Sequence, residues 1–544
     1  MNTTMKPVDY SLYLVTDSTP GILGTADLVS VVEAACRGGV TMVQYREKQA
    51  DTGALVRTAR ALHAVTRRHG VPLLVNDRVD VALAVGCEGV HVGQDDMDVA
   101  TARRLLGPAA LIGVTASTLD EARAAARGGA DYLGLGTVFA TATKTNTKHV
   151  IGTAGLRAIL DGLARDDDAA AAAVRTVCIG GIHAGNVQRV LYQSAAPAKA
   201  LDGVAVVSAV VAAAHPCAAA RSLLTLVRSP PPFARGVLAP GSPAVAASAD
   251  AVLALVPGVI RAVAAQAPLS HNMTNLVVQN LAANVALAVG ASPIMANFGD
   301  EAVDLAALGG ALVVNMGTVT PEGLDNYAKA LRAYNAVGQP VVFDPVGAGA
   351  TAVRRAAVKT LLAAGYVDII KGNEGEVTTV LGEAPPQQQK GVDSSPSTLT
   401  AAAKASLVRR LAARERNVVL MTGAVDYVSD GTRTFAVANG HPLLAAVTGT
   451  GCCLGTTVSA MVAAQRAAAG DGDGDGDSDR LAAVVAALLH YEIAAERAAV
   501  RDDVKGPGSF VPAFLDELAT VRQMTVDGDL AWLAAAKVSL VDEA

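Results

Sequence analysis

The chain has 544 residues, of which 51% are hydrophobic and only 3% aromatic, and its formal net charge is −6 at pH 7. This length suits two large α/β domains, and a core built mainly of Ala, Val and Leu suits parallel sheets covered by helices. The charge shows no basic excess, which excludes nucleic-acid binding as the main function and leaves anion recognition to local groups.

Residues 1–227 alternate between short β-branched runs and stretches of helical period such as 55–69 and 119–127. The runs are Ser11–Asp17, Thr41–Glu47, Pro72–Asp77, Gly89–Gly93, Leu111–Ala116, Tyr132–Val138, Thr176–Ile182 and Gly203–Val210. Strands that alternate with helices in this way predict a closed (β/α)₈ barrel, a TIM barrel, whose chemistry lies at the carboxyl ends of the strands.

Charged and amide side chains end the second run. Gln44, Arg46 and Lys48 are spaced by two, so strand alternation places them on one face. Tyr45 and Glu47 then point to the opposite face. Two cations and an amide on one face indicate an anionic substrate.

Carboxylates follow the next two runs. Asn76 and Asp77 end the third run, and Asp95 and Asp96 follow the fourth. Because neighbouring strands end side by side, these carboxylates can converge on one divalent cation. Oxygen ligands from few protein groups suit Mg²⁺ bound to a substrate phosphate.

The last three strand ends carry hydroxyls, an ammonium group and glycines. They are Thr141, Thr143 and Lys144 after the sixth run, Gly180 and Gly181 at the seventh, and Val207 and Ser208 at the eighth. The last two strand ends are the usual barrel position for a phosphate held by backbone N–H groups. Singly, each residue also fits an ordinary turn or a solvated loop. Together the strand ends indicate a site for two anions.

These residues resemble those of thiamine-phosphate synthases over nearly all of residues 9–215. The matching motifs are Gln44 to Lys48, Asn76-Asp77, His91 to Asp96, Gly134-Leu135-Gly136, Thr141 to Lys144, Ile179 to Ile182 and Val207-Ser208. Thr115 is a departure, because the family usually has serine there. The hydroxyl is kept but the added methyl crowds the pyrimidine pocket, so we expect altered affinity and retained activity.

The resemblance implies a role for each matched residue. A pyrimidine diphosphate would be held by Gln44, Tyr45, Arg46, Glu47, Lys48, Asn76, Thr115 and Lys144, with Mg²⁺ on Asp77 and Asp96. A thiazole phosphate would be held by Thr141, Thr143, Gly181, Val207 and Ser208. Catalysis would consist mainly of stabilising the leaving diphosphate through Mg²⁺, Arg46 and Lys144.

A proline-rich segment, Arg228 to Ser248, separates the two halves. Its sequence RSPPPFARGVLAPGSPAVAAS interrupts an otherwise Ala, Val and Leu rich chain. Proline can neither continue a helix nor donate to a sheet, so we expect an extended, exposed linker at 228–248 between domains at 1–227 and 249–544.

The second half begins with a helical stretch to Pro268, followed by polar residues and an apolar helix within 271–296. The strands predicted after it are Ala311–Asn315, Pro340–Asp344, Val367–Lys371, Val418–Thr422 and Asp426–Ser429. Helical segments lie between the earlier strands, so the pattern indicates an open α/β sheet. Ligands should gather at the carboxyl ends of its strands.

Those strand ends carry short polar motifs, and a glycine-rich turn precedes the last apolar helix. The motifs are NMGT at 315–318, DPVGAGAT at 344–351, KGNEGE at 371–376 and MTGAVD at 421–426. Gly449 and Gly451 in VTGTGCC permit close backbone approach, and the helix start supplies free N–H groups. Gly-Thr-Gly alone also makes ordinary turns, but with the other motifs it predicts an anion hole for a transferring phosphoryl group.

This half resembles hydroxyethylthiazole kinases of the ribokinase-like group over nearly all of residues 250–535. The matching residues are Thr274-Asn275, Met295, Asp344 to Gly347, Lys371 to Asn373 with Glu376, Thr422-Gly423 and Gly449 to Cys452. The resemblance implies that Asn275, Met295 and Gly449 bind the thiazole alcohol, that Lys371 and Thr422 contact ATP, and that Asp344 and Glu376 hold Mg²⁺. Lys371 departs from the arginine of bacterial relatives, which keeps the charge and loses the bidentate fork.

Cys452 takes the place of the catalytic base in this resemblance, where many ribokinase-like enzymes have aspartate. A thiol at a helix N-terminus is expected to have a lowered pKa, yet to remain a modest base for an alcohol. Cys453 lies about 100° further around the helix, so we expect it to pack in the core.

Other features of the chain are given plain interpretations. The six cysteines lack metal-ligand spacing and no secretory segment opens the chain, so a cytoplasmic location is expected. The apolar tract 203–220 is interrupted by His215 and Pro216, which favours a buried strand and helix over a membrane span. Residues 385–397 and the Gly-Asp repeat at 470–479 are expected to be surface loops without a calcium site.

The two resemblances support each other, because the second half would make the thiazole phosphate that the first consumes. Two alternatives remain open for the barrel: a thiazole isomerase, and a module that only senses ligand or oligomerises. The expected partners are small-molecule substrates, with no nucleic acid and no membrane. The kinase resemblance further implies a homo-oligomer, a trimer or a hexamer.

Overall fold

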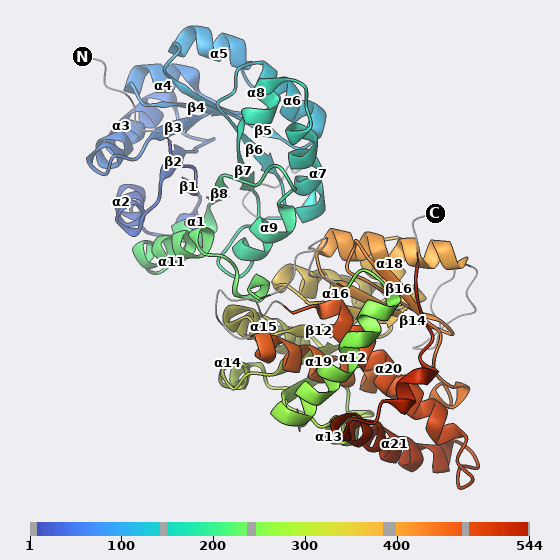
Figure 1. Ribbon diagram of the computed structural model, residues 1–544. Helices are drawn as coiled ribbons and strands as arrows, with labels where there is room; N and C mark the ends of the chain where they lie inside the picture. The colour runs from blue at the N-terminus through green and yellow to red at the C-terminus, as the bar shows by residue number, and fades with distance from the viewer. Residues whose placement is uncertain (1–7, 142–149, 237–245, 384–398, 470–477, 542–544) are drawn as a thin grey trace. The chain divides into compact units, whose positions relative to one another are not determined.

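The computed structural model of the chain describes residues 8–141, 150–236, 246–383, 399–469 and 478–541. It divides into two compact units, Met1–Pro231 and Pro232–Ala544, which Figure 1 colours from blue to green and from green to red. The loops expected at 385–397 and 470–479 lie outside the described residues, apart from Ser478 and Asp479.

Eight parallel strands close the first unit into a barrel in the order β1 to β8, which confirms the predicted fold. They are β1 (Leu12–Val15), β2 (Met42–Tyr45), β3 (Leu73–Asn76), β4 (Gly89–Val92), β5 (Leu111–Ala116), β6 (Tyr132–Gly136), β7 (Arg175–Ile179) and β8 (Gly203–Val206). Each strand lies inside the run predicted for it, except that β7 begins one residue earlier, at Arg175, and several strands end two or three residues before their runs do. The last run is too long, because Ser208–Val211 form helix α10.

Helices cover the outside of the barrel (Figure 1). In chain order they are α1 (Pro20–Leu23), α2 (Leu28–Gly38), α3 (Thr52–Arg68), α4 (Val79–Val85), α5 (Val99–Leu106), α6 (Leu119–Arg127), α7 (Gly152–Ala164), α8 (Ala169–Ala173), α9 (Val187–Ser194), α10 and α11 (Pro216–Arg228). Several begin at an aspartate or threonine whose side chain accepts an N–H of the first turn, as Asp51 and Asp98 do for α3 and α5.

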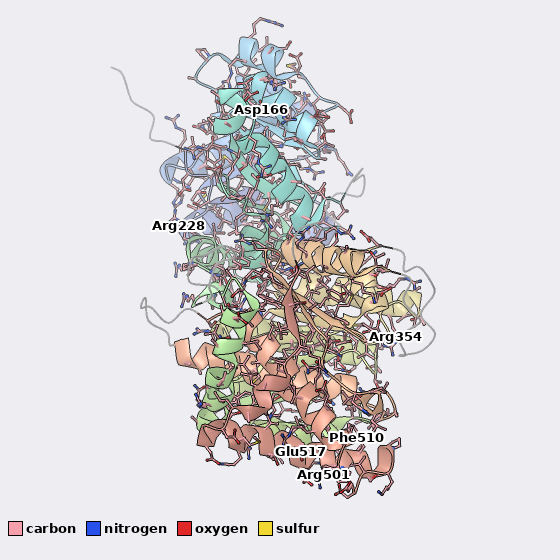
Figure 2. All side chains as sticks on the ribbon, turned by 45° about the vertical axis from the view of Figure 1, so that its right-hand side comes forward. Asp166, Arg228, Arg354, Arg501, Phe510 and Glu517 are labelled. Carbon is pink, nitrogen blue, oxygen red and sulfur yellow. The ribbon has the colours of Figure 1, made fainter. Side chains whose placement is uncertain are left out.

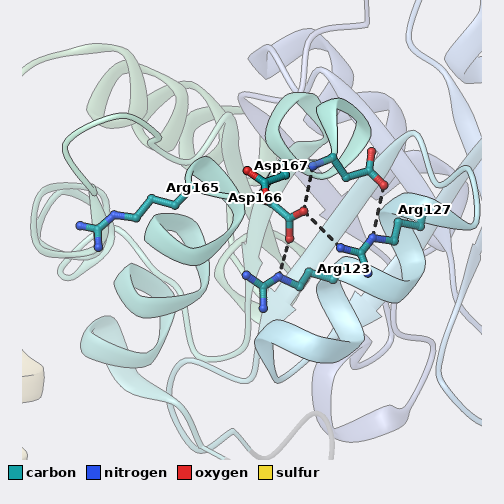
Figure 3. A pocket seen from close by; sticks show the side chains of 6 residues that line it. Arg123, Arg127, Arg165, Asp166 and Asp167 are labelled. Carbon is teal, nitrogen blue, oxygen red and sulfur yellow. Dashed lines mark hydrogen bonds and ion pairs between the residues drawn. The ribbon is translucent and has the colours of Figure 1, made fainter.

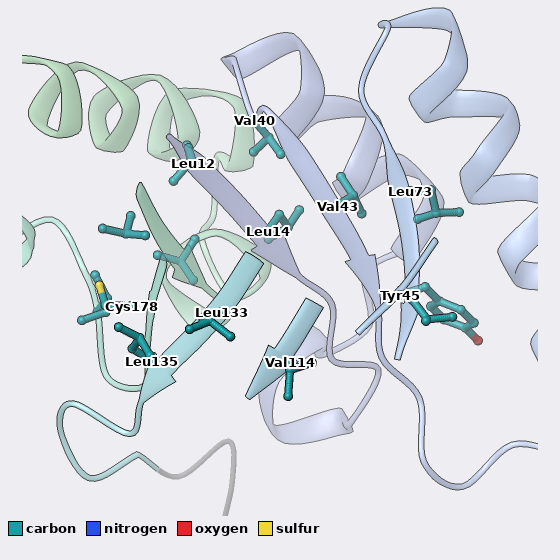
Figure 4. Close-up of a cluster of buried hydrophobic side chains, with 14 of the residues drawn as sticks. Leu12, Leu14, Val40, Val43, Tyr45, Leu73, Val114, Leu133, Leu135 and Cys178 are labelled. Atoms are coloured by element: carbon teal, nitrogen blue, oxygen red, sulfur yellow. The ribbon is translucent and has the colours of Figure 1, made fainter. Parts of the chain in front are cut away.

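Side-chain alternation divides the apolar residues of the barrel into two layers. Tyr13, Met42, Leu74 and Tyr132 form a buried cluster in the barrel interior. The residues between them in sequence, such as Tyr45, belong to the larger cluster between strands and helices, part of which Figure 4 shows. The interior is therefore filled with side chains. Room for ligands is left at the rim, which we define as the residues at and after the carboxyl ends of β1 to β8.

A nine-stranded sheet organises the second unit, in the order β10-β9-β11-β12-β13-β14-β15-β16-β17. The strands are β9 (Leu269–Met273), β10 (Ser292–Ile294), β11 (Ala311–Asn315), β12 (Val341–Asp344), β13 (Ile369–Asn373), β14 (Val418–Thr422), β15 (Asp426–Ser429), β16 (Thr434–Val437) and β17 (Val538–Leu540). Pairing is parallel from β10 to β14 and antiparallel from β14 to β17. The predicted α/β sheet is confirmed.

The helices of the second unit, with short 3₁₀ turns, pack against this sheet or against one another. They are η1 (Pro232–Ala234), α12 (Ala249–Gln266), α13 (Gln279–Val289), η2 (Gly299–Glu301), α14 (Ala302–Ala307), α15 (Pro321–Val337), α16 (Ala352–Ala364), α17 (Glu374–Leu381), α18 (Ala401–Glu415), η3 (Pro442–Leu444), α19 (Thr450–Ala469), α20 (Arg480–Ala499), α21 (Pro507–Asp527) and η4 (Ala531–Ala535). Among the described residues, α12 alone is long and apolar enough to span a membrane. Its Val252, Val256 and Ile260 are buried in the same core as α19 and α20, as in a core helix of a globular domain.

Strand β9 was not predicted, because its sequence is polar. Ser270, His271 and Asn272 are nevertheless buried, at 0%, 0% and 1% exposure. Ser270 bonds Ser459 (2.6 Å) and Asn272 accepts from Thr456 (2.8 Å), both on α19. The buried polar side chains of β9 therefore find hydrogen-bond partners on a helix that lies more than 180 residues further along the chain. Strands β10, β16 and β17 were also not predicted. They have only three or four residues each.

The prediction of an exposed, extended linker is wrong for its first residues. Helix α11 continues to Arg228, which pairs with Asp9 at 2.7 Å. Phe233 is only 3% exposed and its ring stacks on Tyr366 of the second unit, with centroids 4.4 Å apart. Arg480 donates to the carbonyl oxygen of Phe233 (2.6 Å). This segment packs against the protein because Phe233 supplies an apolar ring that is buried. A linker made only of prolines and glycines would have no such ring.

Candidate active sites

The cations predicted at the end of β2 lie at the barrel rim. Arg46 Nη1 is 3.5 Å from the Asp17 carboxylate, and Lys48 Nζ is 3.2 Å from Asp77 Oδ2. Gln44 points into the barrel and is 3% exposed. The Lys48 side chain is 57% exposed. The cations therefore remain accessible to an anion in solution.

Tyr45 and Glu47 point away from this group, as strand alternation predicts. Tyr45 is buried between the barrel and α3, where it hydrogen-bonds the Thr58 side chain, and burial raises the pKa of its phenol. The Glu47 carboxylate accepts from the N–H of Gln49 within its own loop (2.8 Å). These two side chains therefore lie apart from Gln44, Arg46 and Lys48. Tyr45 serves in packing, and Glu47 stabilises its own loop.

The two carboxylates predicted to bind metal lie together. Asp96 shares a hydrogen bond with Asp77 and accepts from the N–H of Gly93 (2.8 Å). Burial, together with the neighbouring Asp77 carboxylate, raises the pKa of Asp96. Asp77 has φ of 61°, a left-handed conformation that costs energy for a residue other than glycine. Asn76 precedes it as the last residue of β3.

The predicted phosphate loops follow the neighbouring strands β6, β7 and β8. Gly181 has φ of +70°, and a Cβ there would lie 2.8 Å from Phe139, so only glycine fits the turn. Val207 and the exposed Ser208 begin α10 directly after β8. Thr141 follows β6. Thr143 and Lys144 lie outside the described residues, so their placement stays a prediction.

Thr115 closes a chain of hydrogen bonds that the sequence did not reveal. Its hydroxyl lies 2.9 Å from His91 Nε2, and His91 Nδ1 lies 2.8 Å from the Tyr132 hydroxyl. The Tyr132 and Tyr13 hydroxyls are 2.8 Å apart, and Gln44 Nε2 donates to Tyr13 at 2.6 Å. We call these five residues the interior chain. It joins two predicted substrate contacts through the middle of the barrel.

The predicted kinase residues meet at the carboxyl ends of β11, β12 and β13. Lys371 Nζ lies 3.2 Å from both oxygens of Asp344, and the pair is almost fully buried, with side chains 6% and 0% exposed. Asn315 donates to Asp344 at 2.9 Å. Burial raises the pKa of Asp344, while Lys371 and Asn315 oppose that shift. Lys371, predicted to contact ATP, is thus also the counter-ion of a predicted metal ligand.

Glu376 lies beside this pair in the first turn of α17. Its carboxylate accepts from the N–H groups of Gly347 (2.7 Å) and Asn373 (2.8 Å), the latter as part of a capping box. Burial, then the nearby Asp344 carboxylate, raises the pKa of Glu376. The motifs at 344–347 and 371–376 are therefore tied together through one carboxylate.

The glycine-rich turn places the N-terminus of α19 over these charges. Gly449 has φ of +94°, and a Cβ at Gly451 would lie 3.8 Å from Lys371 Nζ. The Cys452 sulfur is 4.0 Å from Asn275 Nδ2. Burial raises the pKa of Cys452 to about 11, and Asp344 adds to the rise. The expected lowering of this pKa is therefore wrong, because burial and carboxylates outweigh the helix terminus. Cys453 is fully buried, which confirms its packing role.

The remaining kinase residues surround this centre. Asn275 donates to Asn315 (3.2 Å), and Met295 packs on the core that includes α13 and α19. Thr422 pairs in register with Asn373 at the ends of β14 and β13, and its hydroxyl donates to the Gly372 carbonyl (3.4 Å). The structure thus brings the predicted alcohol, nucleotide and metal residues to one edge of the sheet.

Known proteins with similar sequences fit this arrangement. The probable thiamine biosynthetic bifunctional enzyme of Schizosaccharomyces pombe is 40% identical over 539 residues, which are 98% of this chain and 99% of that protein. The chain belongs to the family of bifunctional thiamine biosynthetic enzymes. The expected fusion of a synthase with a kinase is confirmed.

Each unit of this bifunctional enzyme also matches single-function proteins. The family described as thiamine monophosphate synthase matches residues 12–210, and the hydroxyethylthiazole kinase family matches residues 260–524. The thiamine-phosphate synthase of Chloroflexus aurantiacus is 51% identical over 40% of this chain and 94% of its own. The hydroxyethylthiazole kinase of Moorella thermoacetica is 45% identical over 46% of this chain and 88% of its own. We therefore name Met1–Pro231 the synthase unit and Pro232–Ala544 the kinase unit.

Two residues of the kinase unit to which the sequence assigned no role hold the site together, although Asn315 belongs to the predicted motif at 315–318. Asn315 contacts both Asp344 and Asn275. Arg354, labelled in Figure 2, donates to the carbonyl oxygens of Met316 (2.6 Å) and Val346 (2.7 Å). It thereby ties together the loops after β11 and β12. An arginine in a helix resembles any solvated residue in sequence, and only the fold shows that it reaches these loops.

A buried pair of carboxyl groups supports the nucleotide loop after β14. Asp426 accepts from the N–H of Gly423 (2.8 Å) and is hydrogen-bonded to Glu492 of α20. Burial and the Asp426 carboxylate raise the pKa of Glu492 well above its ordinary value. Burial and the neighbouring carboxylate thus favour the protonated form of Glu492, which can donate to Asp426. The pair fixes the start of the loop that carries Thr422.

A hollow on the synthase unit, away from the strand ends, carries ion pairs of its own. Asp166 accepts from Arg123 and is 3.2 Å from Arg127, which also pairs with Asp168 at 3.2 Å (Figure 3). These residues join α6 to the turn between α7 and α8. Because the charges match one another, this network is explained by packing between helices.

The described residues contain no cluster of three or more His, Cys, Asp or Glu that could hold a metal by themselves. Asp96 lies beside Asp77, and Glu376 lies near Asp344, and two neighbouring carboxylates attract a cation. Mg²⁺ takes few protein carboxylates and completes its shell with water and phosphate oxygens. Both pairs therefore fit Mg²⁺ delivered with a phosphorylated substrate.

Proposed function

We propose that the synthase unit joins an aminopyrimidine methyl diphosphate to a thiazole phosphate at the rim of the barrel. The C–O bond to the diphosphate breaks with its electron pair on the leaving group, and the thiazole nitrogen forms the new C–N bond. The products are thiamine phosphate and diphosphate. The observation that carries this assignment is the contact of Asp77 with Asp96 beside the accessible Lys48.

In this proposal the residues of the rim divide the work. Arg46, Lys48 and Lys144 neutralise the leaving diphosphate, while Gln44, Asn76 and Thr115 hold the pyrimidine. Mg²⁺ on Asp77 and Asp96 would neutralise charge on the diphosphate. The thiazole phosphate binds to Thr141, Thr143, Gly181, Val207 and Ser208. Tyr45 and Glu47 would not contact the substrate. They would hold β2 and the loop after it in place.

We propose that the kinase unit transfers the γ-phosphoryl group of ATP to the alcohol of hydroxyethylthiazole. Asn275, Met295 and Gly449 would hold the thiazole, and Lys371 and Thr422 the nucleotide. Cys452 would take the proton of the alcohol, and the N–H groups at the start of α19 would stabilise the transferring group. Mg²⁺ near Asp344 and Glu376 would neutralise the phosphates.

The proposed enzyme is a homo-oligomer, a trimer or a hexamer. Leu276 and Val277 directly follow Asn275 and are 80% and 77% exposed, which supports burial against a second copy beside the alcohol site. Replacing both by aspartate should give monomers with a raised KM for the thiazole alcohol. Sedimentation velocity at several concentrations measures the assembly, and an unchanged assembly would contradict the proposal.

We place the enzyme in the cytoplasm, where its small-molecule substrates and ATP occur. The six cysteines are free, which suits a reducing compartment. Microscopy of the tagged full chain, with fractionation of the same cells, tests this assignment.

One incubation tests the function as a whole. The purified chain receives ATP, Mg²⁺, hydroxyethylthiazole and the pyrimidine diphosphate, and ADP, diphosphate and thiamine phosphate are followed together. Equal amounts of diphosphate and thiamine phosphate should appear after ADP. ADP without thiamine phosphate would instead support an isomerase or sensing role for the barrel.

A further inference from the structure

The interior chain has a single direction of proton donation. Tyr13 accepts from Gln44, and Tyr132 is its only other hydrogen-bond partner among the described residues. Tyr13 must therefore donate to Tyr132, because an unpaired buried hydroxyl proton is costly. Tyr132 accepts from Tyr13, so its own proton must go to its other partner, Nδ1 of His91. A neutral imidazole that accepts at Nδ1 carries its proton on Nε2, so His91 donates to Thr115.

This direction fixes what each end offers to a ligand. Gln44 donates one N–H to Tyr13, which fixes the orientation of its amide and leaves the carbonyl oxygen as an acceptor. The Thr115 hydroxyl accepts from His91, so its own proton is available to donate. Burial raises the pKa of Tyr13 and Tyr132, and both phenols therefore stay protonated across the working pH range.

We propose that the interior chain is a positioning device that makes the synthase unit specific for an aminopyrimidine. The Gln44 carbonyl would accept from the amino group, and the Thr115 hydroxyl would donate to a ring nitrogen. Tyr13, Tyr132 and His91 then act through these two contacts without touching the reacting atoms. The inference rests on the synthase function proposed above and adds the residues that set its choice of pyrimidine.

Two glycines inside the barrel make room for the rings of the interior chain. A Cβ at Gly113 would lie 2.0 Å from the Tyr132 ring, and a Cβ at Gly134 would lie 3.1 Å from the imidazole of His91. Replacing either would displace the ring that it faces. The barrel backbone is thus shaped around this chain of hydrogen bonds.

The test compares two diphosphate substrates that differ at one group: the aminopyrimidine, and the analogue with an oxo group in place of the amino group. The oxo analogue would face the Gln44 carbonyl with a second acceptor, so the native full-length chain should reject it. Tyr132→Phe breaks the chain at its middle and lets Gln44 and Thr115 reorient. The ratio of kcat/KM values for the amino and oxo substrates should then fall by about tenfold or more.

Tyr10→Phe is the matched control. The Tyr10 ring packs 5.4 Å from that of Tyr132, and its hydroxyl is outside the interior chain. This variant should keep the native ratio. Tyr13→Phe breaks the neighbouring link and serves as a second variant if Tyr132→Phe fails to fold. Inhibition by inorganic diphosphate should be unchanged in each folded variant, because the rim cations are intact.

The outcomes separate this inference from the proposed function. A native ratio in folded Tyr132→Phe or Tyr13→Phe, or an equal loss in Tyr10→Phe, overturns the role of the interior chain while the enzyme still makes thiamine phosphate. A native chain that makes no thiamine phosphate overturns the synthase function and this inference with it.

Discussion

The two active sites handle phosphate chemistry with opposite electrostatic designs. In the kinase unit the central pair, Lys371 and Asp344, is 6% and 0% exposed and already joined. In the synthase unit the corresponding pair, Lys48 and Asp77, is 57% and 23% exposed. A buried ion pair costs much more to break than an exposed one. The ion pair of the kinase site therefore contributes to the stability of the kinase unit. The stability of the synthase unit depends little on the ion pair at its rim.

The sharpest test of this contrast is the same substitution in both sites. Lys371→Met leaves the Asp344 carboxylate buried without its counter-ion, so the free energy of unfolding of the kinase unit should fall by about 3–5 kcal/mol. Lys48→Met removes an exposed partner and should cost about 1 kcal/mol or less. Denaturant unfolding of both full-length variants, followed by circular dichroism and by the fluorescence of Trp532, the single tryptophan of the chain, which lies in the kinase unit, measures the difference. Equal losses would show that the two sites do not differ in this way.

The substitution Asp96→Ala tests the role of the rim in the activity of the synthase unit. The substitution removes one of two carboxylates assigned to the metal, so thiamine phosphate formation should fall at least roughly a hundredfold. Its stability should be unchanged or slightly higher, because the Asp77 carboxylate loses a like-charged neighbour. Kinase activity in the same preparation is the internal control. An unaffected synthase rate would remove Asp96 from the metal site.

Cys452→Ala should have a smaller effect on the kinase. With a pKa of about 11, only a small fraction of the thiol is ionised near neutral pH, and phosphoryl transfer depends mainly on positioning and electrostatics. We expect phosphorylation to slow by about tenfold and not to stop, as measured by ADP release at saturating substrates. Loss to background in a folded variant would make Cys452 indispensable and contradict this expectation.

Glu492→Gln should have the smallest effect, and it concerns pH. The pKa of Glu492 is raised above the ordinary value of 4.5 in the folded state. This carboxyl group therefore adds stability at pH values below 4.5 that is lost as pH rises through its folded pKa. The amide can still donate to Asp426 and carries no charge. At pH 8 the variant should be more stable than the native chain by on the order of 1 kcal/mol, a gap that closes toward pH 4 in denaturant titrations. A loss of stability at pH 8 would contradict the raised pKa of Glu492.

The sequence predicted those parts of the fold whose buried residues are apolar and contiguous. Strand β11 was placed correctly at Ala311–Asn315 for this reason. Strand β9 escaped because its polar side chains are satisfied by α19, far away in sequence. Phe233 was assigned to an exposed linker because the prolines around it dominate the local pattern. Local composition could not show that its ring stacks on Tyr366.

In the candidate sites, too, features visible in the local sequence were predicted, and features made by distant contacts or by burial were not. Asp77 and Asp96 could be paired from sequence, because adjacent parallel strands must end side by side. The interior chain could not, because Tyr13 and Tyr132 are separated by 119 residues and either would pass as a core aromatic. The raised pKa of Cys452 was missed because a helix terminus is visible in sequence, whereas the burial of the thiol is not.

The central claim is that each unit carries one complete reaction, and supplying ready-made thiazole phosphate tests it most directly. Thiamine phosphate formation is measured from this compound and the pyrimidine diphosphate, with Cys452→Ala and Asp96→Ala compared with the native chain. Cys452→Ala should form thiamine phosphate at the native rate, and Asp96→Ala should not. A slow Cys452→Ala enzyme or a fully active Asp96→Ala enzyme would contradict the division of the two reactions between the two units.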